Sequence, residues 1–90
     1  MRLNHKISLT MPTVLRFEAY RFYFYSHEPN EPPHIHVDRN RQSVKFWLEP
    51  VALAKNIGFS AKELKRLQAI VVENQTLFME TWNEYFGCSN

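Results

Sequence analysis

Residues 34–48 have the sequence HIHVDRNRQSVKFWL, and this stretch decides the fold. Polar and apolar side chains alternate over 34–38 and again over 43–48. Alternation with a period of two is typical of a strand that buries one face. The polar run Arg39–Gln42 between the two segments predicts a turn. We therefore expect two neighbouring antiparallel strands here.

The preceding segment predicts two more strands. Six of the nine residues in 17–25 are aromatic, and aromatic side chains favour pleated strands. Segments 13–17 and 20–26 can pair as a hairpin around Glu18-Ala19, whereas the three prolines of 27–33 make that stretch a loop. The first half of the chain thus predicts a small antiparallel sheet.

The period of two also sorts the strand side chains onto two faces. The apolar face, which we expect to be the core face, carries Phe22, Phe24, Ile35, Val37, Val44, Phe46 and Leu48. The opposite face carries Arg21, Tyr23, Tyr25, His34, His36, Asp38, Lys45 and Trp47. An antiparallel sheet that is covered on one side only allows such a polar face.

Helical patterns begin at Pro50, a residue that suits a first helical position. We expect a helix over 51–56 that Gly58 ends, and a second helix that starts at the capping box of Ser60 and Glu63. The second helix carries an apolar stripe, which continues along a last helix. We expect a break between these two helices near Asn74 and the end of the last helix at Gly87. The stripe contains Leu64, Leu67, Ile70, Val71, Leu77, Phe78, Trp82, Tyr85 and Phe86. Helices that cover the apolar sheet face give a two-layer α+β domain.

Composition limits the class of protein. The 90 residues suffice for one small domain, and 44% hydrophobic residues exclude a disordered or fibrous chain. Eleven basic and nine acidic residues are too balanced to establish a nucleic-acid partner. Cys88 is the single cysteine, which excludes an intrachain disulfide and a cysteine-based zinc site. With no apolar run of signal or membrane-spanning length, we expect a soluble cytoplasmic protein.

The ends of the chain differ from its middle. Residues 1–10 are mixed and patternless, and the dense pattern begins at Met11-Pro12. We expect an N-terminal extension over 1–10, a single domain over 11–87 and a short tail over 88–90.

The sequence PPHIHV at residues 32–37 is the first candidate site. Residues two apart on a strand point the same way, with Cα atoms about 6.5–7 Å apart. His34 and His36 could act as acid and base on a phosphodiester, with Lys45 or Arg21 stabilising charge and Tyr23 or Tyr25 orienting the substrate. The alternative is that both histidines are ordinary, half-exposed strand residues.

The same pair could instead bind a divalent metal. Two imidazoles can share one metal ion if a third and a fourth ligand arrive from elsewhere in the fold. His34 and His36 are thus candidate metal ligands, and no other cofactor is expected.

Residues 51–67 resemble a helix-turn-helix, with Ala54 at the helix crossing, Gly58 at the turn and Leu64 as anchor. The outer part of the recognition helix would then carry Lys62, Lys65 and Arg66, which could neutralise up to three phosphates. The alternative is a plain helical hairpin. By contrast, segment 73–84 contains three Glu and no Lys or Arg, which suits either a solvated face or a basic protein partner.

Several segments together resemble the bacterial domain of unknown function 4160 family. They are Met11–Arg16, the aromatic strand Tyr20–Ser26, Glu31–Val37, Lys45–Leu48, Gly58-Phe59-Ser60 and Trp82–Gly87. The resemblance covers about residues 11–87. The family tends to have a glycine near the first hairpin, where this sequence has Glu18-Ala19.

Three hypotheses about function follow. The resemblance implies a small bacterial protein encoded beside another short protein, an arrangement similar to toxin–antitoxin modules, whose toxins are often ribonucleases. The first hypothesis is therefore a toxin-like protein that acts on RNA through the His-x-His sheet face. The second is a DNA-binding module that uses segment 51–67. The third is a non-enzymatic protein-binding module, whose partner is the neighbouring gene product or a second copy of the chain.

Overall fold

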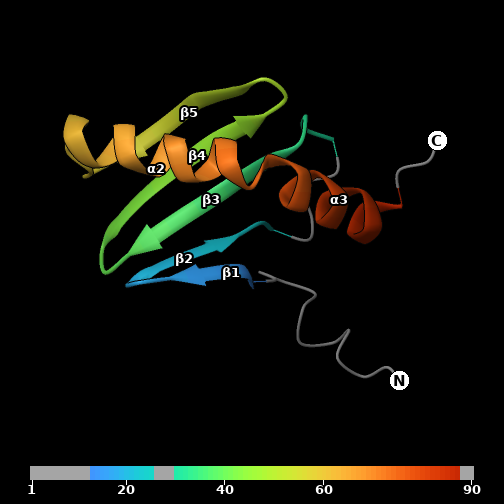
Figure 1. Ribbon diagram of the computed structural model, residues 1–90, viewed down its shortest axis with the longest axis horizontal. Helices are drawn as coiled ribbons and strands as arrows, with labels where there is room; N and C mark the ends of the chain where they lie inside the picture. Colours follow the sequence, from blue (N-terminus) through green and yellow to red (C-terminus); the bar gives the residue numbers. More distant parts are fainter. Residues whose placement is uncertain (1–12, 26–29, 88–90) are drawn as a thin grey trace.

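A five-stranded antiparallel meander, in the order β1-β2-β3-β4-β5, forms one layer of the protein (Figure 1). The structure is a computed structural model that describes residues 13–25 and 30–87. The predicted extension 1–10 and the predicted tail 88–90 therefore lie outside the described residues. The strands are β1 (Thr13–Phe17), β2 (Tyr20–Tyr23), β3 (His34–Arg39), β4 (Gln42–Leu48) and β5 (Val51–Ile57).

Two tight turns join β1 to β2 and β3 to β4, as the sequence predicted. Phe17 pairs with Tyr20 around the first turn, and Arg39 pairs with Gln42 around the second. Glu18 and Asn40 both adopt φ 55°, in the left-handed region. Asparagine tolerates this region, whereas for glutamate it is unusual. Glu18 thus stands in a conformation that suits glycine.

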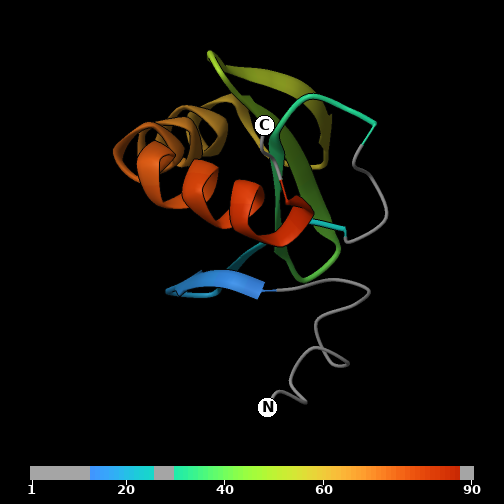
Figure 2. The ribbon, with the colours of Figure 1, turned by 90° about the vertical axis from the view of Figure 1, so that its right-hand side faces the viewer.

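Two helices form the second layer and cover one face of the sheet (Figure 2). They are α2 (Ala61–Glu73) and α3 (Gln75–Phe86). The core between the layers is fully buried, and the α+β prediction is confirmed. Its side chains include Phe22, Ile35, Val37, Phe46 and Leu48 from the sheet, with Leu67, Val71 and Phe78 from the helices.

The predicted helix over 51–56 is wrong, because residues 51–57 form strand β5. β5 pairs along β4, with Leu48 opposite Val51 and Trp47 opposite Ala52. This pairing satisfies backbone groups that a helix of one or two turns would leave unpaired at its ends. The helix-turn-helix over 51–67 is therefore also wrong, since a strand precedes α2.

The ends of both helices follow the prediction. The Ser60 Oγ accepts a hydrogen bond from the Glu63 backbone N–H at 3.1 Å, which caps α2. Asn74 separates the helices, and its side-chain amide donates to the Ile70 carbonyl at 2.8 Å. Gly87, at φ 63°, ends α3 in the left-handed conformation that glycine adopts at little cost.

The cap at Ser60 gives a test of this helix start. Substitution Ser60→Ala removes the acceptor for the Glu63 N–H, and we expect the free energy of unfolding to fall by about 1 kcal/mol. Ser60→Asp keeps an acceptor and should retain most of the stability. Urea unfolding curves measure both effects, and equal losses in the two variants would contradict the capping role.

Candidate functional site

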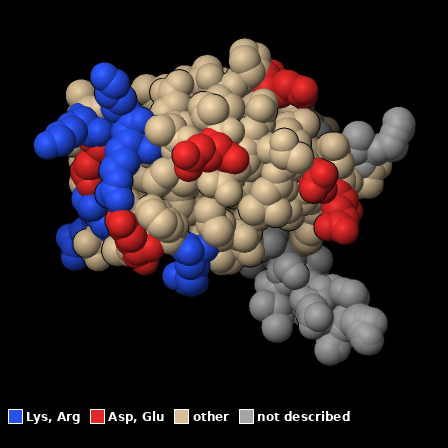
Figure 3. Space-filling view, in the orientation of Figure 1, with Lys and Arg blue, Asp and Glu red and all other residues tan. Residues whose placement is uncertain are grey.

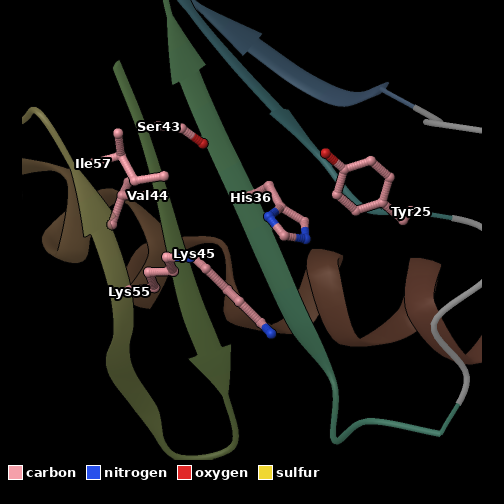
Figure 4. A pocket seen from close by; sticks show the side chains of 7 residues that line it. All are labelled: Tyr25, His36, Ser43, Val44, Lys45, Lys55 and Ile57. Atoms are coloured by element: carbon pink, nitrogen blue, oxygen red, sulfur yellow. The ribbon is translucent and has the colours of Figure 1, made fainter. Parts of the chain in front are cut away.

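The face of the sheet that the helices leave uncovered carries a shallow pocket of about 210 Å³ (Figure 4). In this view the helices pass behind the sheet and the pocket side chains lie in front of it. Four parts of the chain contribute: the residues after β2, and strands β3, β4 and β5. The lining residues are Tyr25, His36, Ser43, Val44, Lys45, Lys55 and Ile57.

The register of the sheet assembles a polar row beneath this pocket. Tyr23 pairs with His36, His36 with Lys45, and Lys45 with Lys55. Directly opposed residues on neighbouring strands point to the same face, with Cβ atoms about 4.5–5.5 Å apart. Side chains from four strands thus meet although they are far apart in the sequence.

A β-bulge in β5 places Lys55 in this row. Lys45 pairs with Lys55 and Phe46 pairs with Leu53, so Ala54 is an extra residue in β5. Because Ala52 lies opposite Trp47 on the open face, strict alternation would turn Lys55 towards the helices. The bulge reverses the alternation, as such bulges re-aim side chains. Sequence reasoning missed Lys55 because it assigned this segment to a helix.

His34 lies beside the pocket and is completely buried, with no exposed surface. Its Nδ1 is 2.9 Å from the Pro32 carbonyl oxygen, and since a carbonyl only accepts, Nδ1 carries a proton and donates. Its ring centroid lies 5.0 Å from that of Trp82, which reaches it from α3. The surroundings of His34 are those of a structural residue that joins the loop, the sheet and α3.

His36, in contrast, lines the pocket and is half-buried. Its ring stacks on Tyr23 with centroids 5.3 Å apart, and Tyr25 meets it edge-on at 4.7 Å. The His34 ring lies 5.1 Å away, also edge-on. The two imidazoles are thus neighbours, as the strand spacing predicted, but His36 is the one that the structure brings to the pocket.

Two lysines give the pocket its charge. The Lys45 Nζ forms an ion pair with Glu31 Oε1 at 2.5 Å, and it also lies 4.7 Å from the Trp47 ring centroid. Lys55 is exposed and makes no ion pair with any described residue. One carboxylate therefore balances one of two ammonium groups, so the pocket keeps a positive charge that favours an anion.

Tyr23 and Arg21, two further predicted site residues, lie next to the pocket. Tyr23 is only 2% exposed, and its hydroxyl donates to the Asp38 carboxylate at 3.0 and 3.1 Å. Burial, hydrogen bonding to Tyr25 and Asp38, and the Asp38 charge raise the pKa of the Tyr23 phenol well above its usual value. Arg21 lies over the Tyr23 ring at 4.5 Å and donates to the Thr13 hydroxyl at 2.7 Å. Tyr23 is thus the buried end of the polar row, and Arg21 packs over its ring.

The predicted nucleic-acid-binding residues lie apart from the predicted metal ligands, because the former are on α2 and the latter on β3. Within residues 13–25 and 30–87, no cluster of three or more His, Cys, Asp and Glu side chains is suited to a metal ion. Lys62, Lys65 and Arg66 lie on the first turns of α2, where Arg66 pairs with Glu18 at 2.8 Å. These cations therefore lie on α2 and not among the residues that line the pocket, and the predicted metal site has no third ligand among the described side chains.

The contrast between the two histidines predicts different effects on stability. His34→Ala removes a fully buried ring and its hydrogen bond, so we expect the free energy of unfolding to fall by about 2–4 kcal/mol. His36→Ala truncates a half-buried ring at the pocket and should cost about 1 kcal/mol. Urea denaturation measures both values. Similar losses for both variants would show that the two rings are not in these different environments.

Comparison with known proteins adds one finding. A family model described as a domain of unknown function (DUF4160) matches residues 19–83. The match spans β2 to β5, α2 and most of α3. No curated protein and no solved structure matches the chain. In the described residues, no helix is both long and apolar enough to cross a membrane.

Proposed function

The chain belongs to the DUF4160 family of unknown function, and we propose that it binds single-stranded RNA in the pocket on the open sheet face. The observation that carries this proposal is the combination of Lys55, a lysine without an ion pair among the described residues, with the aromatic rings of His36 and Tyr25 in one pocket. Cations that follow a phosphate backbone and rings that stack on bases are the two parts of single-strand recognition.

Each side chain has a role that its position supports. Lys55 attracts the phosphate, and Lys45 adds a second contact next to its Glu31 partner. Tyr25 and His36 offer ring surfaces for a base, while the Ser43 hydroxyl can hydrogen-bond to ribose or phosphate oxygens. Because all of these groups except Tyr25 stand on paired strands, most of the site is held in place before the ligand arrives.

We also propose a toxin-like cleavage step for the same pocket. His36 removes the proton from a ribose 2′-hydroxyl, and that oxygen attacks the adjacent phosphorus, which yields a 2′,3′-cyclic phosphate. The bond from phosphorus to the 5′-oxygen breaks, and the leaving oxygen takes a proton from water. The hydroxide formed in this way takes the proton back from His36, which restores the neutral base. Lys45 and Lys55 lie where they can stabilise the charge on the phosphoryl oxygens. His34 does not react in this step; its ring packs against the His36 ring and helps to hold it in position.

Binding is tested with a uridine trinucleotide, which is short enough to report on the pocket. We expect Lys55→Gln to weaken binding about 5-fold at 0.1 M salt and to reduce the log–log salt dependence by about 0.7, since one phosphate contact is lost. Nuclear magnetic resonance titration measures both quantities. Thr76→Glu, at an exposed position of α3, changes the net charge equally and should leave binding unchanged. A trinucleotide that does not bind, or binds equally to both variants, contradicts the RNA site.

The cleavage step and the two-gene module are tested in cells. We expect induced expression of the chain to arrest growth, His36→Ala to abolish the arrest, and co-expression of the neighbouring gene product to relieve it. Glu84→Ala on α3 serves as the control and should leave the arrest in place. Growth curves and sequencing of cellular RNA ends measure the outcome. If induction leaves growth and RNA ends unchanged, the toxin-like role is wrong, although RNA binding could still hold.

A further inference from the structure

We propose that one end of the molecule forms a second RNA-contacting surface, which continues the pocket along the phosphate backbone. This surface, called the basic end, consists of Arg41, Lys62 and Lys65. The inference rests on the proposed function, and it adds that the ligand is an RNA long enough to leave the pocket. In Figure 3 the Lys and Arg side chains gather at the end where α2 begins, while acidic groups predominate towards α3.

The antiparallel topology brings these cations together. The β1–β2 turn, the β3–β4 turn and the start of α2 all lie at the same end of the sheet (Figure 1). Gln42, at the β3–β4 turn, donates its side-chain amide to the Gly58 carbonyl at 2.9 Å. In sequence, Arg41 directly precedes Gln42. The turn that carries Arg41 is thus fastened to the segment that leads into α2.

A second link fastens the same turn to α2 itself. Arg39 forms an ion pair with Glu63 at 2.5 Å and also donates to the Gln42 side chain at 2.7 Å. Lys62 directly precedes Glu63 in the first turn of α2. Arg41 and Lys62 are therefore carried by two elements that hydrogen bonds and an ion pair hold at a fixed separation.

The charge at this end is not balanced within the described chain. Glu18 at the β1–β2 turn and Glu63 in the first turn of α2 are already paired with Arg66 and Arg39. Arg41, Lys62 and Lys65 are exposed and have no ion pair with a described residue. Like charges held close together repel one another, and a polyanion relieves that repulsion while releasing its counterions.

The pocket leads towards the basic end. Two of its lining residues, Ser43 and Ile57, are paired with each other next to the β3–β4 turn. Ser43 is two residues from Arg41, and Ile57 directly precedes the Gly58 that Gln42 contacts. A strand of RNA whose phosphate lies at Lys55 therefore has the next uncompensated cations at Arg41 and Lys62.

RNA length separates the basic end from the pocket. We expect a uridine 20-mer to bind with a steeper salt dependence than the trinucleotide, because it contacts more phosphates. The double substitution Arg41→Gln/Lys62→Gln should weaken binding of the 20-mer up to about 25-fold at 0.1 M salt and reduce its log–log salt slope by about 1.4. Binding of the trinucleotide should stay unchanged. Thr76→Glu/Asn83→Glu, which lowers the net charge equally on exposed α3 positions, is the matched control.

The possible outcomes decide between the two proposals. If the double variant binds the 20-mer as the unchanged protein does, or if the control loses as much affinity, the basic end is not an RNA surface and the pocket proposal survives. If the trinucleotide fails to bind, the pocket proposal falls on its own. If the double variant keeps 20-mer binding but loses binding to phosphatidylglycerol vesicles, the basic end is overturned as an RNA surface in favour of a lipid one.

Discussion

Burial of one face of the sheet under α2 and α3 is the constraint on which the rest of this protein depends. Phe22 stacks on Phe78 with ring centroids 5.8 Å apart, and both side chains are almost fully buried. Within residues 13–25 and 30–87, both helices lie on this one side of the sheet (Figure 2). The other sheet face is thereby left to polar and aromatic side chains, and the candidate site occupies it.

The packing of the helices against the sheet also explains why His34 and His36 on the polar face have different surroundings. His34 sits where α3 extends to the end of the sheet, so Trp82 contacts its ring while the Pro32 carbonyl accepts a hydrogen bond from it. His36 lies two residues further along β3, away from that contact, and shares a pocket with Lys45. Two chemically identical side chains thus receive different surroundings from one helix. This difference makes His34 part of the scaffold and His36 part of the pocket.

The basic residues of the surface fall into two groups, according to whether an acidic partner lies beside them. Arginines and lysines that face acidic groups, such as Arg39 with Glu63 and Lys45 with Glu31, hold turns and loops in place. Cations without such partners among the described residues, such as Lys55 and Lys62, remain available to an external anion. The net charge of +2 conceals this arrangement, because the distribution of charge rather than its sum determines what the surface attracts.

The sequence by itself determined the strands up to Leu48, the capped helix from Ser60 and the side to which each residue of β2, β3 and β4 points. Local alternation and capping chemistry suffice for these features. Only the tertiary structure decided that residues 51–57 pair with β4, and that the bulge at Ala54 brings Lys55 to the sheet face that carries His36. It also decided that Trp82 covers His34. Strand pairing and helix docking join residues that are far apart in the chain. The contacts that stabilise them therefore depend on several distant segments at once, and no short sequence pattern predicts them.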